Sequence, residues 1–415
     1  MNLTKEQRGA MLSKIEQTVA EKHYDPAFNL RTWKDIVAKH RAAIVDATNN
    51  PAFEQAARSM LGDLSPKGLG LLSKTTPITS RNAINASFTT EPASNGFRWV
   101  FQDVLPGGVA EKAGVHSGDI LLTAAGKPMT PAAALAPEPP FEMAHTIPIT
   151  VRRGNAGQEM SFSLQTGEPR YKDNPYSDLT ALKSEVRKDG IAYLKVSLFP
   201  GKIGIDFANE LDHIFREQFR STNKLIIDLR GNPGGGIGGL TLMSYLTPSR
   251  LPIGYSRNRK MALDGTHPSS LPVFDKVPRS KLAIPGLALK FLGKTSIHLY
   301  TEALAENAYH GRVVILVNEH TTGAAEMLAQ FAKENGLATI VGAKTPGRLV
   351  SRSATKLGHG YRLIVPVAAY VSAKGTQIEG SGITPDVVVP WSSEDAVLGL
   401  DYQLAKATQV LGQQG

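Results

Sequence analysis

The chain has 415 residues, with 46 Lys and Arg against 37 Asp and Glu and a formal net charge of +9. This length exceeds one ordinary hydrophobic core, so two or three domains are expected. The cations are scattered rather than gathered with aromatic residues into a patch, which speaks against nucleic acid as a partner. The absence of cysteine excludes disulfides, thiolate catalysis and cysteine-ligated zinc.

No stretch approaches the ~20 apolar residues of a membrane span, and the charged segment from Met1 to Tyr24 lacks the apolar run of a signal peptide. As written, the sequence is therefore expected to be cytoplasmic and without a membrane span. A signal segment upstream of it would make the protein periplasmic or secreted.

Helical periodicity dominates residues 1–64. Thr4 and Gln7 have the spacing of a capping box, and apolar residues then recur at helical intervals as far as Val19. The pattern repeats after Trp33, and Pro51 is typical of the first turn of a third helix. We therefore expect a small helical unit at the N-terminus.

Short apolar runs alternate with turns over residues 65–170, which predicts a mainly β module. Within it, residues 104–115 carry a Pro-Gly-Gly turn and an Ala-Gly pair, and Gly118-Asp119-Ile120-Leu121 follows. This order resembles the central strand, short helix and next strand of a PDZ domain. The resemblance implies a sheet edge that holds an extended peptide, with Trp99, Val100 and Phe101 as peptide-binding residues. A β module that serves only as a structural spacer is the alternative.

Strands and helices alternate over residues 173–391, which predicts an α/β domain. The run Leu225–Leu229 is apolar except for Asp228, as in a sheet covered on both faces. Val313–Val317, a helix from about Ala324 to Glu334, and Thr339–Val341 form a β-α-β unit with a parallel crossover. Residues 249–300, rich in Gly, Pro and Ser, are expected to be a surface excursion or lid. Residues 392–415 are expected to contain a C-terminal helix.

Two strand-to-helix turns are candidates for chemistry. The first, Asp228–Gly236, reads Asp-Leu-Arg-Gly-Asn-Pro-Gly-Gly-Gly, and its backbone N–H groups suit an oxyanion hole. Its glycines also match a dinucleotide-binding pattern, but no acidic residue follows at the distance a ribose requires. The second turn, Val317–Glu326, places small residues at a helix start. Because ligands bind at the carboxyl ends of strands in open α/β sheets, both turns are expected to face one crevice.

These turns, together with Ile340-Val341-Gly342, Thr345, Gly347 and residues 382–386, stand in the order found in the C-terminal processing, or tail-specific, protease family. The chain resembles this family as far as Trp391. The resemblance implies an α/β (α+β multidomain) fold: a helical unit, a PDZ-like module and a peptidase core with a mixed, largely parallel sheet of the ClpP/crotonase type. It also implies a serine-type peptidase, with no cofactor and no metal, acting on polypeptides captured through the PDZ domain.

The family's catalytic pair is substituted in this chain. By the resemblance, the nucleophilic serine falls on Gly323, its lysine base on Arg348 and a supporting glutamine on Arg352. Glycine has no side chain, and a guanidinium stays protonated, so neither residue supplies the expected chemistry. The resemblance therefore applies only to the groups around the catalytic pair, which we call the frame. The frame comprises the oxyanion donors Gly234 or Gly235 with Ala324, and the carboxylate Glu326 at the helix start.

Two hypotheses remain open. A hydroxyl of Thr321 or Thr322 with His320 or His359 as base, or alternatively Ser351 or Ser353, would give a rearranged peptidase. Otherwise the chain is a pseudoprotease that binds a polypeptide, a peptide C-terminus or a small ligand, as retinoid-binding proteins of the retina do with the same fold. In that case Arg348 would pair with a carboxylate.

Overall fold

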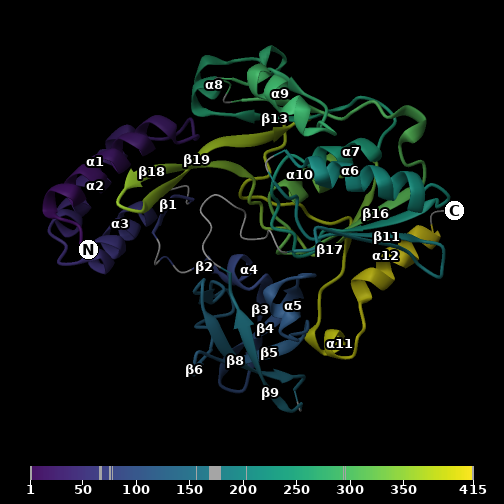
Figure 1. Ribbon diagram of the computed structural model, residues 1–415, viewed down its shortest axis with the longest axis horizontal. Helices are drawn as coiled ribbons and strands as arrows, with labels where there is room; N and C mark the ends of the chain where they lie inside the picture. Colours follow the sequence, from purple (N-terminus) through teal and green to yellow (C-terminus); the bar gives the residue numbers. More distant parts are fainter. Residues whose placement is uncertain are drawn as a thin grey trace.

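The computed structural model describes residues 2–64, 68–73, 76, 78–155, 157–167, 179–201, 203–292, 294 and 296–413. Figure 1 shows a helical unit at the N-terminus, a β module at the bottom of the view and a larger α/β core. The C-terminal segment runs from the β module back to the core. The fold is thus mixed α/β, as the sequence predicts.

The N-terminal unit contains α1 (Lys5–Lys22), α2 (Leu30–Val45) and α3 (Asn50–Gly62). The capping box is present, because the Thr4 and Gln7 side chains each accept a hydrogen bond from the other's backbone N–H. The apolar faces of the helices enclose the fully buried Trp33 and Phe53. The three helices are therefore confirmed where helical periodicity predicts them.

A hairpin from late in the chain completes the core of this unit. It consists of β18 (Val350–Gly358) and β19 (Tyr361–Ser372), and its side chains Tyr361, Leu363 and Val365 are buried against the helices. The Tyr361 hydroxyl donates to the Glu54 carboxylate at 3.0 Å. The short strand β1 (Gly70–Leu72), which falls in the range expected for the β module, pairs with β19 instead.

The β module is a sheet in the order β3-β4-β5-β8-β9, with β6 beside β5. The strands are β3 (Ala86–Ala93), β4 (Gly96–Val104), β5 (Asp119–Ala124), β6 (Lys127–Pro128), β8 (Thr146–Arg153) and β9 (Glu159–Gln165). The one-turn helix α5 (Val109–Lys112) lies between β4 and β5, at the predicted Pro-Gly-Gly segment. A separate pair of short strands, β2 (Ile78–Thr79) and β7 (Pro140–Phe141), and the helix α4 (Ser80–Ala83) adjoin this sheet.

The core sheet has the order β10-β11-β12-β16-β17-β20 and is parallel from β11 onward. Its strands are β10 (Leu182–Val186), β11 (Ala192–Val196), β12 (Lys224–Asp228), β16 (Arg312–Val317), β17 (Thr339–Gly342) and β20 (Val387–Val388). One face is covered by α6 (Ile205–His213) with its π-helical extension Ile214–Gln218, by α7 (Gly239–Tyr245) and by α10 (Ala324–Glu334). The other face is covered by α12 (Tyr402–Gln413).

The alternation of β12 explains its apolar run. Leu225 and Ile227 pack under the α6, α7 and α10 layer, whereas Ile226 packs under α12. Both faces need apolar side chains because successive residues of a strand point to opposite faces of the sheet.

Residues 249–300 contain β13 (Pro252–Arg257), α8 (Arg259–Asp264), the 3₁₀ turn Pro268–Ser270, β14 (Val273–Phe274), the 3₁₀ turn Lys281–Ala283, α9 (Ile284–Lys290) and β15 (His298–Tyr300). A further 3₁₀ turn spans Ala305–Asn307. The expectation of a surface excursion needs correction, because β13 pairs with β19 and β15 with β13, so both belong to a sheet. The helices α8 and α9 of this segment lie at the outer edge of the molecule, at the top of Figure 1.

The C-terminal segment bridges the β module and the core. Its helix α11 (Ser393–Val397) lies against the module, where a Cβ added to Gly118 would come within 2.8 Å of the Val397 side chain. The chain then reaches α12 on the core sheet. None of the helices in the described ranges combines the length and the apolar character needed to cross a bilayer.

Candidate active site

The two predicted turns meet at one edge of the core sheet, because they follow the neighbouring parallel strands β12 and β16. The Thr322 N–H donates to the Asn232 carbonyl at 2.8 Å. A Cβ added to Gly323 would lie 3.3 Å from the Gly234 Cα. The sequence expectation of a shared crevice is therefore confirmed.

A crevice of about 950 Å³ opens where the turns meet. It is bounded by both turns, by the start of α10, by the beginning of β18, by residues of β13 and β15, and by Arg81 of α4. Its polar and charged lining side chains are Arg81, Asn82, Ser256, Lys294, Thr322, Arg348, Ser351, Arg352 and Tyr370. None of the lining residues is a carboxylate or a histidine.

Some backbone N–H groups at the crevice already donate a hydrogen bond, and others are open, that is, without an acceptor among the described residues. Gly234 donates to Asn232 Oδ1 at 2.7 Å and Gly236 donates to the Phe199 carbonyl at 2.9 Å. Over the described ranges, the N–H groups of Gly235 and Ala324 have no hydrogen-bond acceptor. Of the oxyanion donors expected from sequence, Gly235 and Ala324 are therefore the available pair, and Gly234 is corrected to a structural role.

Gly323, the residue at the nucleophile position, has φ 64° and ψ −127°. This region of backbone space favours glycine, because a side chain there is strained. The Gly323 N–H points toward Glu326 Oε2 at 3.1 Å and the Arg348 carbonyl at 3.2 Å. These two acceptors hold the backbone of the sharp turn into α10 in place.

Glu326 is fully buried and accepts four hydrogen bonds. Its Oε1 accepts from the Thr345 hydroxyl at 2.6 Å and the Gly347 N–H at 2.7 Å. Its Oε2 accepts from the Gly323 N–H at 3.1 Å and the Arg348 N–H at 2.8 Å. A carboxylate with both oxygens engaged holds the 345–348 loop against the N-terminus of α10, where the helix dipole favours negative charge.

The hydroxyl candidates have different surroundings. Thr321 is buried, and its hydroxyl donates to the Leu229 carbonyl at 2.9 Å, so it fastens the two turns together. Thr322 and Ser351 line the crevice, whereas Ser353, two residues further along β18, is not among the lining residues. Of the candidate hydroxyls, Thr322 and Ser351 therefore lie at the crevice.

Neither histidine candidate serves the crevice. His320 is buried, with Nδ1 3.3 Å from a Glu138 carboxylate oxygen and Nε2 3.2 Å from Gln102 Oε1, both in the β module. His359 lies exposed in the turn between β18 and β19. Thr322 consequently has no imidazole beside it to accept its proton.

Four cationic side chains surround the crevice: Arg81, Lys294, Arg348 and Arg352. Arg81 donates to the His320 carbonyl at 3.1 Å and lies 4.0 Å from Glu138. The guanidinium groups of Arg348 and Arg352 have no hydrogen-bonded or ion-pair partner in the part of the chain that the structure describes. Burial, and then the nearby Arg81 cation, lower the pKa of Arg348 from its usual value. An anion bound here would relieve that repulsion.

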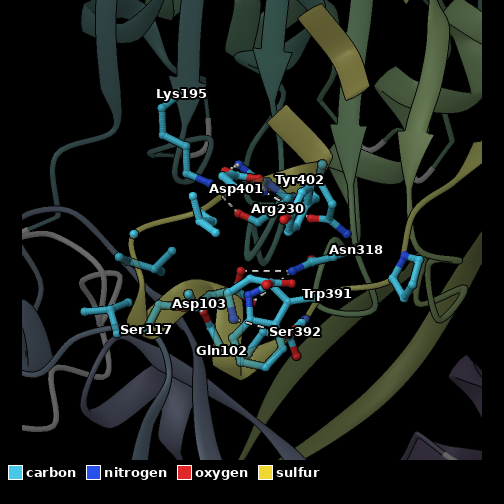
Figure 2. Close-up of a pocket in the computed structure, with 18 residues that line it drawn as sticks. Gln102, Asp103, Ser117, Lys195, Arg230, Asn318, Trp391, Ser392, Asp401 and Tyr402 are labelled. Carbon is cyan, nitrogen blue, oxygen red and sulfur yellow. Dashed lines mark hydrogen bonds and ion pairs between the residues drawn. The ribbon is translucent and has the colours of Figure 1, made fainter. Parts of the chain in front are cut away.

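The β module contacts the second turn directly through Asp103 of β4. Asn318 Nδ2 donates to both Asp103 oxygens, at 2.9 and 3.1 Å, and Asn318 Oδ1 accepts from the Gly231 N–H at 3.0 Å. Figure 2 shows Asn318 reaching across to Asp103. Sequence reasoning does not identify Asp103, because 215 residues separate it from Asn318.

A second, smaller pocket of about 300 Å³ lies between the β module, the core sheet and the C-terminal segment (Figure 2). At its base Arg230 bridges two carboxylates, contacting Asp228 at 2.7 Å and Asp401 at 2.8 Å, while Lys195 contacts Asp228 at 3.2 Å. Burial alone would raise the pKa of Asp228, but the Arg230 and Lys195 cations outweigh it and hold that pKa well below its usual range. The network anchors the start of the glycine turn to α12.

Trp99, Val100 and Phe101 lie in β4 and are buried. Trp99 and Val100 pair with β3 on one side and β5 on the other, and Phe101 pairs with Phe88 of β3. The peptide-binding role expected for these three residues therefore needs revision, because they form the interior of the module and Trp99 and Val100 have no free strand edge. The outer strands of this sheet are β3 and β9, and in β3 the Phe88 N–H donates to Glu138 at 3.4 Å.

Comparisons with known proteins agree with this architecture. Residues 190–389 match the model of peptidase family S41. The chain is 24% identical over 384 residues to carboxyl-terminal-processing peptidase 3, chloroplastic, of Arabidopsis thaliana, covering 89% of this chain and 66% of the relative. It is 30% identical over 200 residues to a carboxyl-terminal-processing protease of Synechocystis, covering 48% of this chain and 38% of the relative. These matches thus span less than two thirds of the relatives.

Solved structures share the fold at low sequence identity. The photosystem II D1 C-terminal processing protease superposes with a TM-score of 0.59 at 17% identity, over 98% of both chains. Residues 190–389 therefore match peptidase family S41, and the chain is similar over most of its length to carboxyl-terminal-processing proteases.

Proposed function

We propose that this protein binds polypeptides in its S41 crevice by their carboxylate groups and does not hydrolyse them by the family's serine–lysine route. The observation that carries the proposal is the unpaired Arg348 guanidinium, which lines the same crevice as Gly323 and the open N–H groups of Gly235 and Ala324. A guanidinium and backbone N–H groups are the donors that proteins use to hold a terminal carboxylate.

Hydrolysis of a peptide bond by covalent catalysis needs a nucleophile and a group that accepts its proton. Gly323 provides no nucleophile, and Arg348 does not give up its proton at working pH. Glu326 lies directly below but already accepts four hydrogen bonds. The chain thus retains the N–H donors that would stabilise a negatively charged oxygen, but it lacks the nucleophile and the base that would generate that oxygen.

We further propose that the β module presents the polypeptide to the crevice. Three contacts support this role: Asp103 with Asn318, Glu138 with His320, and Glu138 with Arg81. Glu138 also accepts from the Phe88 N–H of the outer strand β3. A peptide laid along β3 would lie close to groups that touch the second turn of the crevice.

A second candidate function, hydrolysis by a rearranged nucleophile, is favoured by the position of Thr322. Thr322 immediately precedes Gly323 and lines the crevice that Ala324 also lines. The lining residues include no carboxylate or histidine that would accept its proton.

Binding is tested with a fluorescent unstructured peptide carrying a free C-terminal carboxylate, and with the same peptide amidated at its C-terminus. We expect Arg348→Ala to weaken binding of the free acid by roughly 10- to 100-fold, the range for losing a charged hydrogen bond. Binding of the amide should hardly change, and Arg348→Lys should retain part of the affinity. The matched control is Arg220→Ala, an exposed cation that does not line the crevice. Equal binding of acid and amide would overturn the proposal.

Hydrolysis is tested on an unfolded polypeptide substrate with the wild type and with Gly323→Ser combined with Arg348→Lys. We expect no cleavage by the wild type. Cleavage gained by the double variant would support an intact frame that lacks its catalytic pair. Wild-type cleavage that disappears in Thr322→Ala would replace the binding function with the second candidate.

A further inference from the structure

Three leucines project from the outer edge of the molecule around α9. Leu282, Leu289 and Leu292 are 91%, 74% and 75% exposed. On the other side of the same segment, Leu287 and Phe291 pack against the core, and the Phe291 ring lies 5.7 Å from that of Phe274. The segment is thus anchored by one apolar side and presents a second apolar side outward. Grouped exposed apolar side chains of this kind mark interaction surfaces.

The same surface is cationic. Lys281, Lys290 and Lys294 are exposed, and none of the three forms an ion pair within the described ranges of the chain. Residues 276–301 contain no Asp or Glu. The acids that flank this stretch are already paired, Asp275 with Arg250 at 2.9 Å and Glu302 with Arg279 at 3.2 Å. Together Lys281, Leu282, Leu289, Lys290, Leu292 and Lys294 form what we call the leucine–lysine patch.

We propose that the leucine–lysine patch docks the protein on an anionic phospholipid surface. Exposed leucines beside lysines are the composition of segments that lie in a bilayer interface, where the apolar side chains enter the acyl boundary and the cations meet lipid phosphates. Charge complementarity therefore favours a negatively charged lipid surface as the occupant.

Other occupants fit the patch less well. A second copy of the chain would bring its own lysines against these ones, with no acid in residues 276–301 to offset the repulsion. Surfaces that bind proteins are rich in Arg, Tyr and Trp and poor in Lys, whereas this patch combines Lys with Leu.

The geometry has a consequence for the crevice. Lys294 belongs both to the patch and to the crevice lining, and Ile297 and Leu299, a few residues further along, also line the crevice. Docking through α9 would bring the crevice close to the lipid surface, with the β module at the opposite end of the molecule (Figure 1). Polypeptides near a membrane would then be its nearest ligands.

The full chain is tested by cosedimentation with vesicles of phosphatidylglycerol and phosphatidylcholine, and with vesicles of phosphatidylcholine alone. We expect binding only to the anionic vesicles, weakened by salt. Leu289→Ser with Leu292→Ser, and Lys281→Glu with Lys290→Glu, should each lower partitioning by at least about tenfold.

The matched controls are Leu135→Ser, at a leucine of the β module that is 96% exposed, and Lys188→Glu, at an exposed lysine outside the patch. Both should bind like the wild type. Circular dichroism and thermal melting check that all variants fold. We expect them to fold, because the substituted positions are exposed. Absence of vesicle binding, or equal binding by patch and control variants, overturns the proposal. So does a lipid-independent dimer that the leucine substitutions dissociate, measured by light scattering.

Discussion

A side chain at Gly323 should be strained but not sterically blocked. A Cβ there would lie 3.3 Å from the Gly234 Cα, 3.6 Å from the Pro233 carbonyl oxygen and 4.0 Å from that of Arg348. Only the first contact is tight, so the main cost is the φ of 64°, about 1–3 kcal/mol. The lower entropy of the unfolded alanine or serine chain offsets about 0.4–1 kcal/mol. We therefore expect Gly323→Ala and Gly323→Ser to lower the free energy of unfolding by about 1–2 kcal/mol.

Substitutions at two other glycines should bracket the loss of stability expected at Gly323. Gly336 has the same φ of 64° with nothing within 4 Å of an added Cβ, so Gly336→Ala should cost about 1 kcal/mol. At Gly235 the Cβ would lie 2.0 Å from the Phe199 carbonyl oxygen, so Gly235→Ala should cost roughly 3 kcal/mol or more. Urea unfolding followed by far-ultraviolet circular dichroism measures all three. The reasoning is refuted if Gly323→Ala is as stable as the wild type, or as destabilised as Gly235→Ala.

Two further predictions concern buried carboxylates. Glu326→Ala leaves three donors without their acceptor, since the Gly323 N–H keeps the Arg348 carbonyl. It should lower the free energy of unfolding by about 3–5 kcal/mol, with Glu326→Gln costing less; comparable urea midpoints for both variants and the wild type would contradict this. Because the folded-state pKa of Asp228 is depressed, its ionised form stabilises the protein above the unfolded pKa of about 3.9, and this contribution is lost as the pH falls below that value. Asp228→Asn should therefore be less stable than the wild type at about pH 7, and the difference should shrink below about pH 4; a pH-independent difference would refute the assignment.

Local patterns made most of the secondary structure predictable. The capping box at Thr4, the apolar run of β12 and the small residues before α10 each encode their element within a few positions. Local patterns did not predict the strands within residues 249–300. The strand β13 is short and irregular around Gly254, and it pairs mainly with the distant strand β19. Such pairing depends on contacts that no local window contains.

The candidate site is likewise predictable only in part from the sequence. The turn sequences, through their resemblance to the protease family, place Gly323, Gly235 and Ala324 at the site. The engagement of His320 by Glu138 and Gln102, and of the Gly234 N–H by Asn232, depends on how side chains meet after folding. Sequence alone therefore indicates which groups gather at the crevice but not which of them are left unpaired.

The hairpin that closes the helical unit bears on how the protein is made. The helices end at Gly62, but the side chains that complete their core, from Tyr361 to Val365, follow about three hundred residues later. At typical synthesis rates of about 5–20 residues per second, the apolar faces around Trp33 and Phe53 wait roughly 15–60 seconds for their partner strand. The helical unit is thus synthesised well before the strand that completes its core, and its exposed apolar faces would be a binding surface for a chaperone in that interval.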